Sequence, residues 1–340
     1  MSQPLLSVVV LNWNARSYIL NCLKSIINSE YSNLEIILID NDSQDGSIAL
    51  LKDSLTQDEL SKLKIIINEK NYGAAHALNQ GAGIARGKYI TFVATDTKID
   101  SACFGEMVKV FESDESIAGA SCKLLMMDNP GQFDSAGEYL NQYGFLLQRH
   151  AEHETDKGQF DEIVELFGVK GTALTVRKDV FDLAGGYPED YFMFLEETDL
   201  CWRIWLSGYR IVFVPSAVIY HVSGASVNSH KHASYIVKYY GSRNYITTLF
   251  KNLGALSLIK ILPVHVFMWL SLGMLFVFKK RFKECAYIMK GVFWNFIHFR
   301  KILEQRRVIQ EKRKLSDSQL MPKIMRHVNL SYLFDRVGMW

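Results

Sequence analysis

Two apolar runs that end in polar residues decide the fold, Val8-Val9-Val10-Leu11-Asn12-Trp13-Asn14 and Leu38-Ile39-Asp40-Asn41-Asp42. Neither run alternates with polar residues as a half-exposed strand does, so we interpret Leu6–Asn12 and Leu34–Asp40 as buried strands. Apolar residues at helical spacing lie between them, from Tyr18 to Ile27. The same alternation continues with a strand, a small-residue helix and another strand, at Leu63–Asn68, Tyr72–Ala85 and Lys88–Ala94.

This order of strands and helices predicts an α/β fold, with a mixed, mostly parallel sheet and helices on both faces. Ligands of such sheets bind outside the carboxyl ends of the strands. Asn12, Asp40 and Asp96 lie at the carboxyl ends of three of the predicted strands, so we expect them at one edge of the sheet. Further along, the patterns predict the strands Ile117–Leu125, Gly171–Arg177, Ile211–Val214 and Ala217–His221 and the helix Glu196–Ser207.

The composition excludes several classes of protein. The chain has 340 residues, of which 49% are hydrophobic and 22% charged, with 6 prolines, so disorder and collagen are excluded. Its five cysteines form no Cys-x-x-Cys pair and are odd in number, which argues against a zinc ribbon or a disulfide framework and favours a reducing compartment. The N-terminus lacks the basic segment of a signal peptide.

The charge is distributed unevenly along the chain. Residues 279–326 contain 14 Lys and Arg against 4 Asp and Glu, whereas the rest of the chain has 24 basic and 32 acidic residues. A mildly acidic body argues against nucleic-acid binding, and a basic C-terminal region indicates contact with an anionic membrane surface.

We expect two domains, a catalytic domain at residues 1–230 and a helical, basic, membrane-associated region at 231–340. Ile261–Phe278 carries no charge but is short for a span, and we expect Pro263 to break it near its start. In Glu284–Phe299 a polar stripe at helical spacing predicts an interfacial helix with aromatic anchors. The stripe consists of Glu284, Gly291, Asn295 and His298, and the anchors are Tyr287, Phe293, Trp294 and Phe299. We expect a re-entrant hairpin or helices in the interface plane; a buried helical subdomain or an oligomer interface is the alternative.

Four motifs in order together resemble the family 2 glycosyltransferases, which have the nucleotide-sugar-binding GT-A fold. The first two are the strand ends quoted above, the second running on to Ser47, and the third runs from Asn71-Tyr72-Gly73 through Gly87-Lys88-Tyr89. The fourth, Tyr191 to Arg203 with Glu196-Glu197-Thr198-Asp199, is similar to the acceptor motif of the rhamnosyltransferase-like branch. The resemblance covers roughly residues 5 to 225.

The resemblance implies that the first motifs bind the nucleotide-sugar donor. Asp40 can accept a hydrogen bond from the base, and Asp42 or Asn12 can contact the base or ribose. The loop from Asn41 to Gly46 is also a good helix cap, with Asp45 in the first turn, and both interpretations can hold. The donor-binding residues expected from the resemblance are Asn12, Asn14, Asp40, Asp42, Asn71, Gly73, Asn79, Thr95 and Asp96.

Asp96 matches the last aspartate of the family's DxD-like element, which implies a contact with Mg²⁺ or Mn²⁺ and with the diphosphate. This chain has Ala94-Thr95-Asp96, so the first carboxylate of that element is missing. One carboxylate with phosphate oxygens and water can still hold Mg²⁺. The resemblance also permits His221 as a second metal ligand, although a lone histidine is more often structural.

Glu197 occupies the position of the family's catalytic base, with Glu in place of Asp. A carboxylate there can take the proton of the acceptor hydroxyl. Its neighbour Glu196 points about 100° away on a helix, so only one of the two is expected to face the donor. Acidic residues also favour a helix N-terminus without any catalytic role. Glu196, Asp199 and Arg203 are candidate acceptor-binding residues, and Asp199 and Arg203 could instead pair on the surface.

The resemblance therefore implies an inverting glycosyltransferase at the cytoplasmic face of the cell membrane. The donor is of the dTDP-rhamnose or UDP-hexose type, and the acceptor is a lipid-linked glycan or surface polysaccharide; a homo-oligomer is left open. A rival reading is a catalytically weak nucleotide-sugar-binding subunit of a membrane-bound assembly. A nucleotidyltransferase fits less well, because Asn12-Trp13-Asn14-Ala15 lacks a basic glycine-rich loop.

Overall fold

The computed structural model describes residues 3–222 and 233–329, which fall into two compact units. Among these residues the first unit contains 3–138, 148–204 and 209–222, and the second contains 139–147, 205–208 and 233–329. The expected domain boundary at 230/231 lies outside the described residues. Each unit is treated by itself below.

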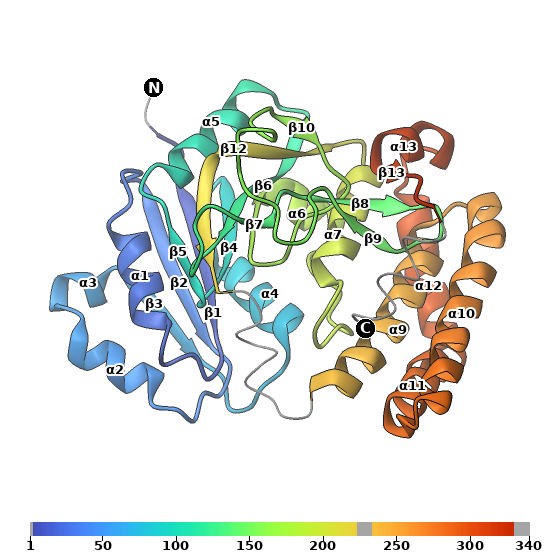
Figure 1. Cartoon of the computed structure of the whole chain (residues 1–340). Helices are drawn as coiled ribbons and strands as arrows, with labels where there is room; N and C mark the ends of the chain where they lie inside the picture. The colour runs from blue at the N-terminus through green and yellow to red at the C-terminus, as the bar shows by residue number, and fades with distance from the viewer. Residues whose placement is uncertain (1–2, 223–232, 330–340) are drawn as a thin grey trace. The chain divides into compact units, whose positions relative to one another are not determined.

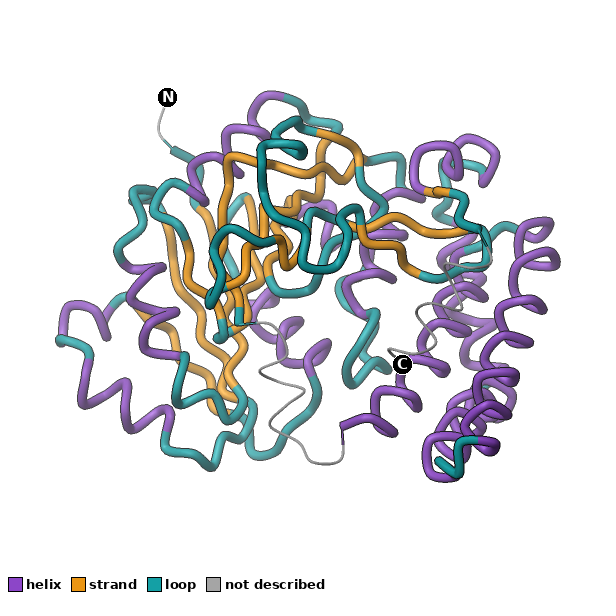
Figure 2. Tube along the Cα trace, viewed as in Figure 1, coloured by secondary structure: helices purple, strands orange, loops and turns teal. Residues whose placement is uncertain are grey.

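The first unit is built on a mixed sheet (Figures 1 and 2). Its main path runs β10-β12-β6-β11-β4-β1-β2-β3, with β5 on β12 and β7 on β6. Strands β1 to β4 are parallel to one another, and β11 runs antiparallel between β4 and β6. The strands are β1 (Leu6–Asn12), β2 (Leu34–Asp40), β3 (Leu63–Ile67), β4 (Tyr89–Ala94), β5 (Thr97–Ile99), β6 (Ile117–Met126), β7 (Phe133–Ser135), β10 (Val164–Glu165), β11 (Ala173–Arg177) and β12 (Arg210–His221).

Helices cover both faces of this sheet, which confirms the predicted α/β arrangement. Alternate residues of a strand point to opposite faces, so Val8 and Val10 pack in one core with α1 and α5. Val9 points the other way, where its side chain fills the space beside Gly81 of α4. The helices of this unit are α1 (Ile19–Ile27), α2 (Ser47–Ser54), α3 (Gln57–Ser61), α4 (Ala74–Ile84), α5 (Cys103–Ser113), α6 (Lys178–Ala184) and α7 (Glu196–Leu206).

The two short strands expected at 211–214 and 217–221 are one strand, β12. Its pairing with β6 shifts between Val214 and Val218, because Val214 pairs with Cys122 while Val218 pairs with Lys123. Pro215 lies in this interval and has no N–H to donate to the ladder. The extended chain therefore continues through a bulge, where the sequence pattern predicted a break between two strands.

The second unit is mainly helical, with a separate small sheet in the order β13-β8-β9. In it α9 packs against α10, α11 and α12. The elements are β8 (Glu138–Asn141), β9 (Leu146–Gln148), α9 (Ala233–Asn252), α10 (Ala255–Phe278), α11 (Phe282–Ile297), α12 (Phe299–Glu311), α13 (Asp317–Ile324) and β13 (Met325–Arg326).

The predicted break at Pro263 is wrong, since α10 runs without interruption for 24 residues. At 1.5 Å per residue this is about 36 Å, so the expectation of a segment short for a span is also corrected. By length and composition, α10 is the one helix among the described residues that could cross a membrane.

The polar stripe of α11 faces the protein. Asn295 is buried, and its Oδ1 accepts a hydrogen bond of 2.7 Å from Thr247 of α9. Gly291 approaches so closely that a Cβ there would lie 2.1 Å from the Ser242 hydroxyl. The interfacial helix expected from this stripe therefore presents the opposite side, with Phe293 and Phe296 more than half exposed.

Large apolar side chains line the outside of α10 and α11, and we call this surface the apolar face. On α10 they recur at intervals of three to five residues along the whole helix. Its members are Leu256, Ile259, Val264, Phe267, Leu270, Met274 and Phe278 on α10 and Phe282, Phe293, Phe296 and Ile297 on α11.

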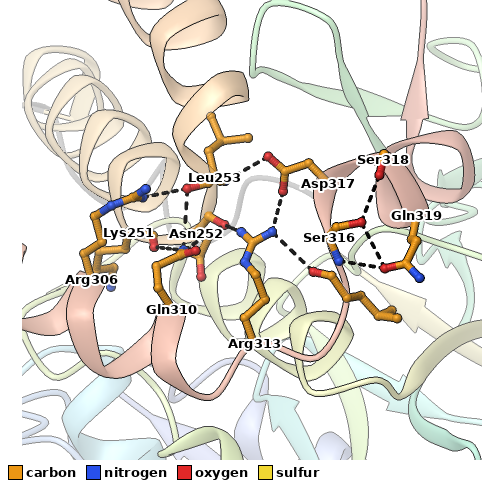
Figure 3. Close-up of polar contacts among 12 residues, drawn as sticks. Lys251, Asn252, Leu253, Arg306, Gln310, Arg313, Ser316, Asp317, Ser318 and Gln319 are labelled. Atoms are coloured by element: carbon orange, nitrogen blue, oxygen red, sulfur yellow. Dashed lines mark hydrogen bonds and ion pairs between the residues drawn. The ribbon is translucent and has the colours of Figure 1, made fainter.

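Two cations of the basic region are used inside the protein. Arg306 Nη1 donates to the carbonyl of Leu253 at 2.6 Å, and Arg313 donates to Asn252 O and to Asp317 Oδ1 at 2.6 Å (Figure 3). Asp317 in turn accepts from the backbone N–H of Gly254 at 2.8 Å. These groups satisfy carbonyls at the C-terminal end of α9, which have no partner within the helix.

Replacing Arg313 by alanine is therefore expected to destabilise the second unit by about 1–3 kcal/mol, the usual cost of losing a charged hydrogen bond. Arg307, an exposed neighbour, provides the matched control, and its alanine variant is expected to stay within about 0.5 kcal/mol of wild type. Urea unfolding followed by tryptophan fluorescence checks this. Equal effects of the two substitutions would contradict the capping role.

Candidate active site

The carboxyl ends of β1 and β2 lie level in the sheet, because Asn12 pairs in register with Asp40. Asn12 Nδ2 donates to Asp40 Oδ1 at 2.6 Å and also to the hydroxyls of Ser43 and Ser47. Asp40 Oδ2 accepts from the backbone N–H of Ser43 at 3.1 Å. Asn12 is fully buried, and its hydrogen bond orients the Asp40 carboxylate from the interior of the protein.

Asn14 and Asp42 shape the loops that follow these two strands. Both adopt a left-handed backbone, with φ of 49° and 64°. Asn14 Oδ1 accepts from the backbone N–H of Gln44 at 2.8 Å, which ties one loop to the other. Asp45 accepts from the N–H of Ser47, the first residue of α2, but it lies before the N-cap Gly46, so its predicted place in the first turn of the helix is wrong.

The Asn71-Tyr72-Gly73 segment is held by Asn41, a residue that the sequence analysis did not single out. Asn41 Nδ2 donates to Asn71 Oδ1 at 2.8 Å, and its Oδ1 accepts from Tyr72 N at 3.2 Å. Gly73 has φ of 88°, and a Cβ there would lie 2.6 Å from the carbonyl of Phe192. The third motif thus contacts the fourth through backbone that only glycine permits.

Asn79 is engaged in a structural contact. Its Nδ2 donates to Tyr187 O at 2.9 Å, and its Oδ1 accepts from Tyr187 N at 2.9 Å. Both ends of the amide are therefore used to hold the turn at Gly186-Tyr187. This pairing accounts for Asn79 without a donor contact, and we remove it from the candidate donor-binding set.

Asp96 and His221 come together at the end of the sheet. His221 Nε2 lies 3.4 Å from Asp96 Oδ1, and its Nδ1 lies 2.8 Å from Asp134 Oδ2. Asp134 also pairs with Lys170, whose Nζ reaches both carboxylate oxygens, at 2.8 and 2.7 Å. Asp134 and Lys170 lie outside the four motifs and were missed, because nothing local in the sequence marks them.

The ionisation of this cluster follows from its contacts. Burial alone would raise the pKa of Asp134, but the hydrogen bond with His221 and the charge of Lys170 hold that pKa well below its usual range. Burial alone would lower the pKa of His221, but its contacts with Asp134 and Asp96 outweigh burial and raise it. Asp134 is therefore ionised and can only accept hydrogen bonds.

The first turn of α7 brings the two predicted base candidates into a partly buried position. The Glu197 carboxyl packs against Gly171, where a Cβ would lie 3.2 Å from Oε1. Burial raises the pKa of Glu197 well above its usual value, and the charges of Glu196 and Glu138 add to the effect. Burial also raises the pKa of Glu196 to about 7. Glu138, on β8, is a third buried carboxylate that the sequence analysis missed.

Asp199 and Arg203 pair as their spacing predicted, but the pair is buried. Arg203 Nε donates to Asp199 Oδ2 at 2.8 Å, with Asp199 fully buried and Arg203 nearly so. Arg203 Nη1 also donates to the carbonyl of Ala184, at the end of α6. The surface-pair alternative is therefore wrong, and the pair fixes α7 on α6.

Comparison with known sequences supports the family resemblance of the N-terminal part of the chain. Residues 7–156 match the model of the glycosyl transferase family 2. The chain is 38% identical over 92 residues to a glycosyltransferase, GlyG, of Streptococcus pneumoniae, and 33% identical over 96 residues to a putative teichuronic acid biosynthesis glycosyltransferase, TuaG, of Bacillus subtilis. These matches cover 27% and 28% of this chain and 30% and 37% of the two relatives. Residues 7–156 are thus similar to a family 2 glycosyltransferase domain, while the matched part spans only about a third of those relatives.

Solved structures agree on the fold. The S. aureus TarS fragment 1–349 in complex with UDP-GlcNAc has a TM-score of 0.61 at 16% identity, covering 90% of this chain and 86% of that one. The mannosyltransferase PcManGT from Pyrobaculum calidifontis, in complex with GDP-Man and Mn²⁺, has a TM-score of 0.55 at 16% identity, covering 87% and 88%. The predicted GT-A fold is confirmed.

The two raised carboxyl pKa values give a testable pH dependence of stability. Because the folded state binds these protons more tightly than the unfolded state, whose glutamate pKa is about 4.3, stability falls as pH rises from about 4.5 through about 7. Glu197→Gln removes one of the two charges, so its Tm is expected to exceed that of wild type at pH 8 and to match it at pH 5. Thermal melts of the exposed control variant Glu189→Gln are expected to show no such pH-dependent gain. A gain for Glu197→Gln that is equal at both pH values would contradict this account.

Proposed function

We propose that this protein is an inverting glycosyltransferase that moves a sugar from a nucleotide-diphospho-sugar to a hydroxyl of a lipid-linked glycan or surface polysaccharide. The observation that carries the proposal is the meeting of Asp96 and His221 at the carboxyl edge of a family 2 domain. Asp40, oriented by Asn12, lies at that same edge, at the end of β2.

The donor's nucleotide would lie over the loops that follow β1 and β2. Asp40 supplies a buried acceptor for the base, and Asp42, with its left-handed backbone, is available for the base or ribose. Asn14, Asn71 and Gly73 act by shaping these loops, as their hydrogen bonds indicate. TarS and PcManGT are described with UDP-GlcNAc and GDP-Man respectively, which supports a sugar nucleotide as ligand.

Asp96 and His221 fit a divalent cation. Asp96 Oδ1 is buried and accepts no hydrogen bond from the described residues, and an imidazole nitrogen lies 3.4 Å from it. No group of three or more His, Cys, Asp or Glu side chains converges as a ligand set within the described ranges, so the other ligands would be donor phosphates and water. Mg²⁺ or Mn²⁺ held there would offset the negative charge of the departing nucleoside diphosphate.

Glu197 is the proposed general base. It takes the proton of the acceptor hydroxyl as the hydroxyl oxygen attacks the anomeric carbon, and the nucleoside diphosphate leaves from the opposite face, so the anomeric configuration inverts. Its raised pKa makes the ionised form a stronger base, at the cost of a smaller ionised fraction at low pH. Glu196, also with a raised pKa, remains the second candidate.

The second unit supports a membrane location at the cytoplasmic face, where sugar nucleotides are made. Exposed apolar patches of this extent mark interaction sites, and the apolar face follows the whole length of α10. A cavity of about 620 Å³ beside α11 is lined by Tyr239, Tyr287, Phe293 and Trp294, with Lys290 among them. Aromatic side chains next to lysine are typical of the membrane interface. Because α10 packs one side on protein and exposes the other, we favour helices lying in the interface over a single span.

A thermal-shift screen tests the donor class. UDP-GlcNAc, UDP-glucose, UDP-galactose, dTDP-rhamnose and GDP-mannose are each added with Mn²⁺ and with EDTA, since a ligand that binds the folded state raises its Tm. One of them is expected to give a shift of several degrees that requires Mn²⁺. No shift with any of them would contradict the donor-binding proposal, whereas binding without slow hydrolysis or transfer would favour a catalytically weak binding subunit.

Glu197→Gln is expected to keep donor affinity and to lower turnover by roughly 10²-fold or more, the usual scale for removing a general base. Glu196→Gln is expected to lower it by much less. Release of nucleoside diphosphate from the selected donor measures both. If the larger loss occurs in Glu196→Gln, the roles of the two glutamates are exchanged.

Changing Phe267 and Met274 to glutamate is expected to reduce binding to vesicles of phosphatidylcholine and phosphatidylglycerol by at least about tenfold, or ~1.4 kcal/mol. Ile163→Glu, at an exposed apolar residue of the first unit, is the matched control and is expected to bind as wild type does. Flotation of the full chain on a density gradient measures binding. Unchanged flotation, or a stable dimer that the double substitution dissociates, would instead favour an oligomer interface.

A further inference from the structure

Asp134, Lys170 and His221 form a charged cluster next to Asp96. The four sequence motifs do not account for this cluster. Asp134 lies on β7, Lys170 in the segment between β10 and β11, and His221 at the end of β12. Asp134 is 9% exposed and His221 6%. Burying charges is costly unless they are paired, so a cluster of this kind needs a reason.

The hydrogen bonds of the cluster fix the chemistry of the His221 ring. Lys170 Nζ donates to both oxygens of Asp134, which marks a carboxylate that accepts, so the hydrogen between it and His221 sits on Nδ1, at 2.8 Å. Nε2, which faces Asp96 at 3.4 Å from Oδ1, is then the ring nitrogen left to bind a cation. Asp96 and His221 are close enough that both could hold one divalent cation.

Lys170 determines what Asp134 can do. Its Nζ bonds both carboxylate oxygens of Asp134, and Oδ2 is shared with His221. With both oxygens occupied, Asp134 cannot turn to bind a cation itself and stays behind the histidine ring. The lysine charge also balances one of the two carboxylates, so Asp96, Asp134 and Lys170 together carry a net charge of −1.

We propose that Asp134 and Lys170 are positioning residues that hold His221 in the tautomer and orientation needed to bind a divalent cation together with Asp96. Asp134 fixes the ring, and Lys170 fixes Asp134. The inference rests on the proposed donor-binding function and adds two residues to it. A carboxylate that bonds the second nitrogen of a ligand histidine typically contributes 10- to 100-fold to metal affinity.

The test titrates the full-length protein with Mn²⁺, with and without UDP, and follows free Mn²⁺ by electron paramagnetic resonance. Asp134→Asn keeps the shape of the side chain, but its amide can either accept from Nδ1–H or donate to Nδ1, so it no longer fixes the tautomer. Mn²⁺ affinity is therefore expected to fall 10- to 100-fold. Lys170→Met is expected to lower affinity as well, and Lys170→Arg to restore most of it. Spin-echo modulation from an imidazole nitrogen on Mn²⁺ is expected in wild type and is expected to weaken in Asp134→Asn.

Asp156→Asn is the matched control, because Asp156 pairs with the buried Lys123 at 2.7 Å in the same unit without contacting His221. It is expected to leave Mn²⁺ affinity unchanged. UDP affinity in EDTA and the circular dichroism spectrum are expected to be the same in all variants. If Asp134→Asn does not fold, the Lys170 pair of variants decides alone.

The outcomes separate this inference from the proposed function. Wild-type affinity for Mn²⁺ in Asp134→Asn and Lys170→Met, or an imidazole signal that neither variant alters, overturns the positioning role and leaves donor binding intact. A wild-type protein that binds UDP but no Mn²⁺ overturns the positioning role too, while the nucleotide site stands. A wild-type protein that binds neither overturns both.

Discussion

The register between β1 and its two parallel neighbours is the constraint on which the candidate site depends. Asn12 stands level with Asp40 on one side, and Leu11 stands level with Ala94 on the other. Because parallel strands all end at the same edge, this register brings the Asp40 loop and the Asp96 turn together without any direct bond between them. A slip of one residue would turn Asn12 to the opposite face and remove the group that orients Asp40.

The candidate site shows which parts a sequence can predict. Strand ends rich in β-branched residues and followed by Asn or Asp are local signals, and β1 and β2 have the predicted bounds. Asp134 and Lys170 carry no such signal, since Asp134 meets His221 across 87 residues of chain and Lys170 meets Asp134 across 36. The position of Asp134 depends on which strand β7 joins, and that pairing with β6 is a tertiary choice.

The periodicity of a helix shows that its two faces differ, but it does not show which face meets water. The spacing of Gly291 and Asn295 on α11 correctly indicates a distinct face, but not whether that face meets water or protein. The answer depends on α9, where Ser242 and Thr247 offer hydroxyls to it. The α9–α11 contact thus has polar groups inside, while aromatic residues of α11 lie outside. Arg306 and Arg313 are used at the end of α9, so the net charge of the region overstates what its surface offers to lipid headgroups.

The place of β11 in the sheet affects how the chain folds while it is being synthesised. β11 lies between β4 and β6 and bonds to both, yet it follows β4 in the chain by some 80 residues. At about 5–20 residues per second of synthesis, β4 leaves the ribosome roughly 4–16 seconds before its partner strand exists. During that interval one edge of the nascent β1–β4 sheet is open, with Phe92 and Val93 beside unpaired backbone, and such edges invite pairing with other chains. Early contact of the nascent chain with a chaperone would protect this edge until residues 173–177 emerge and close it.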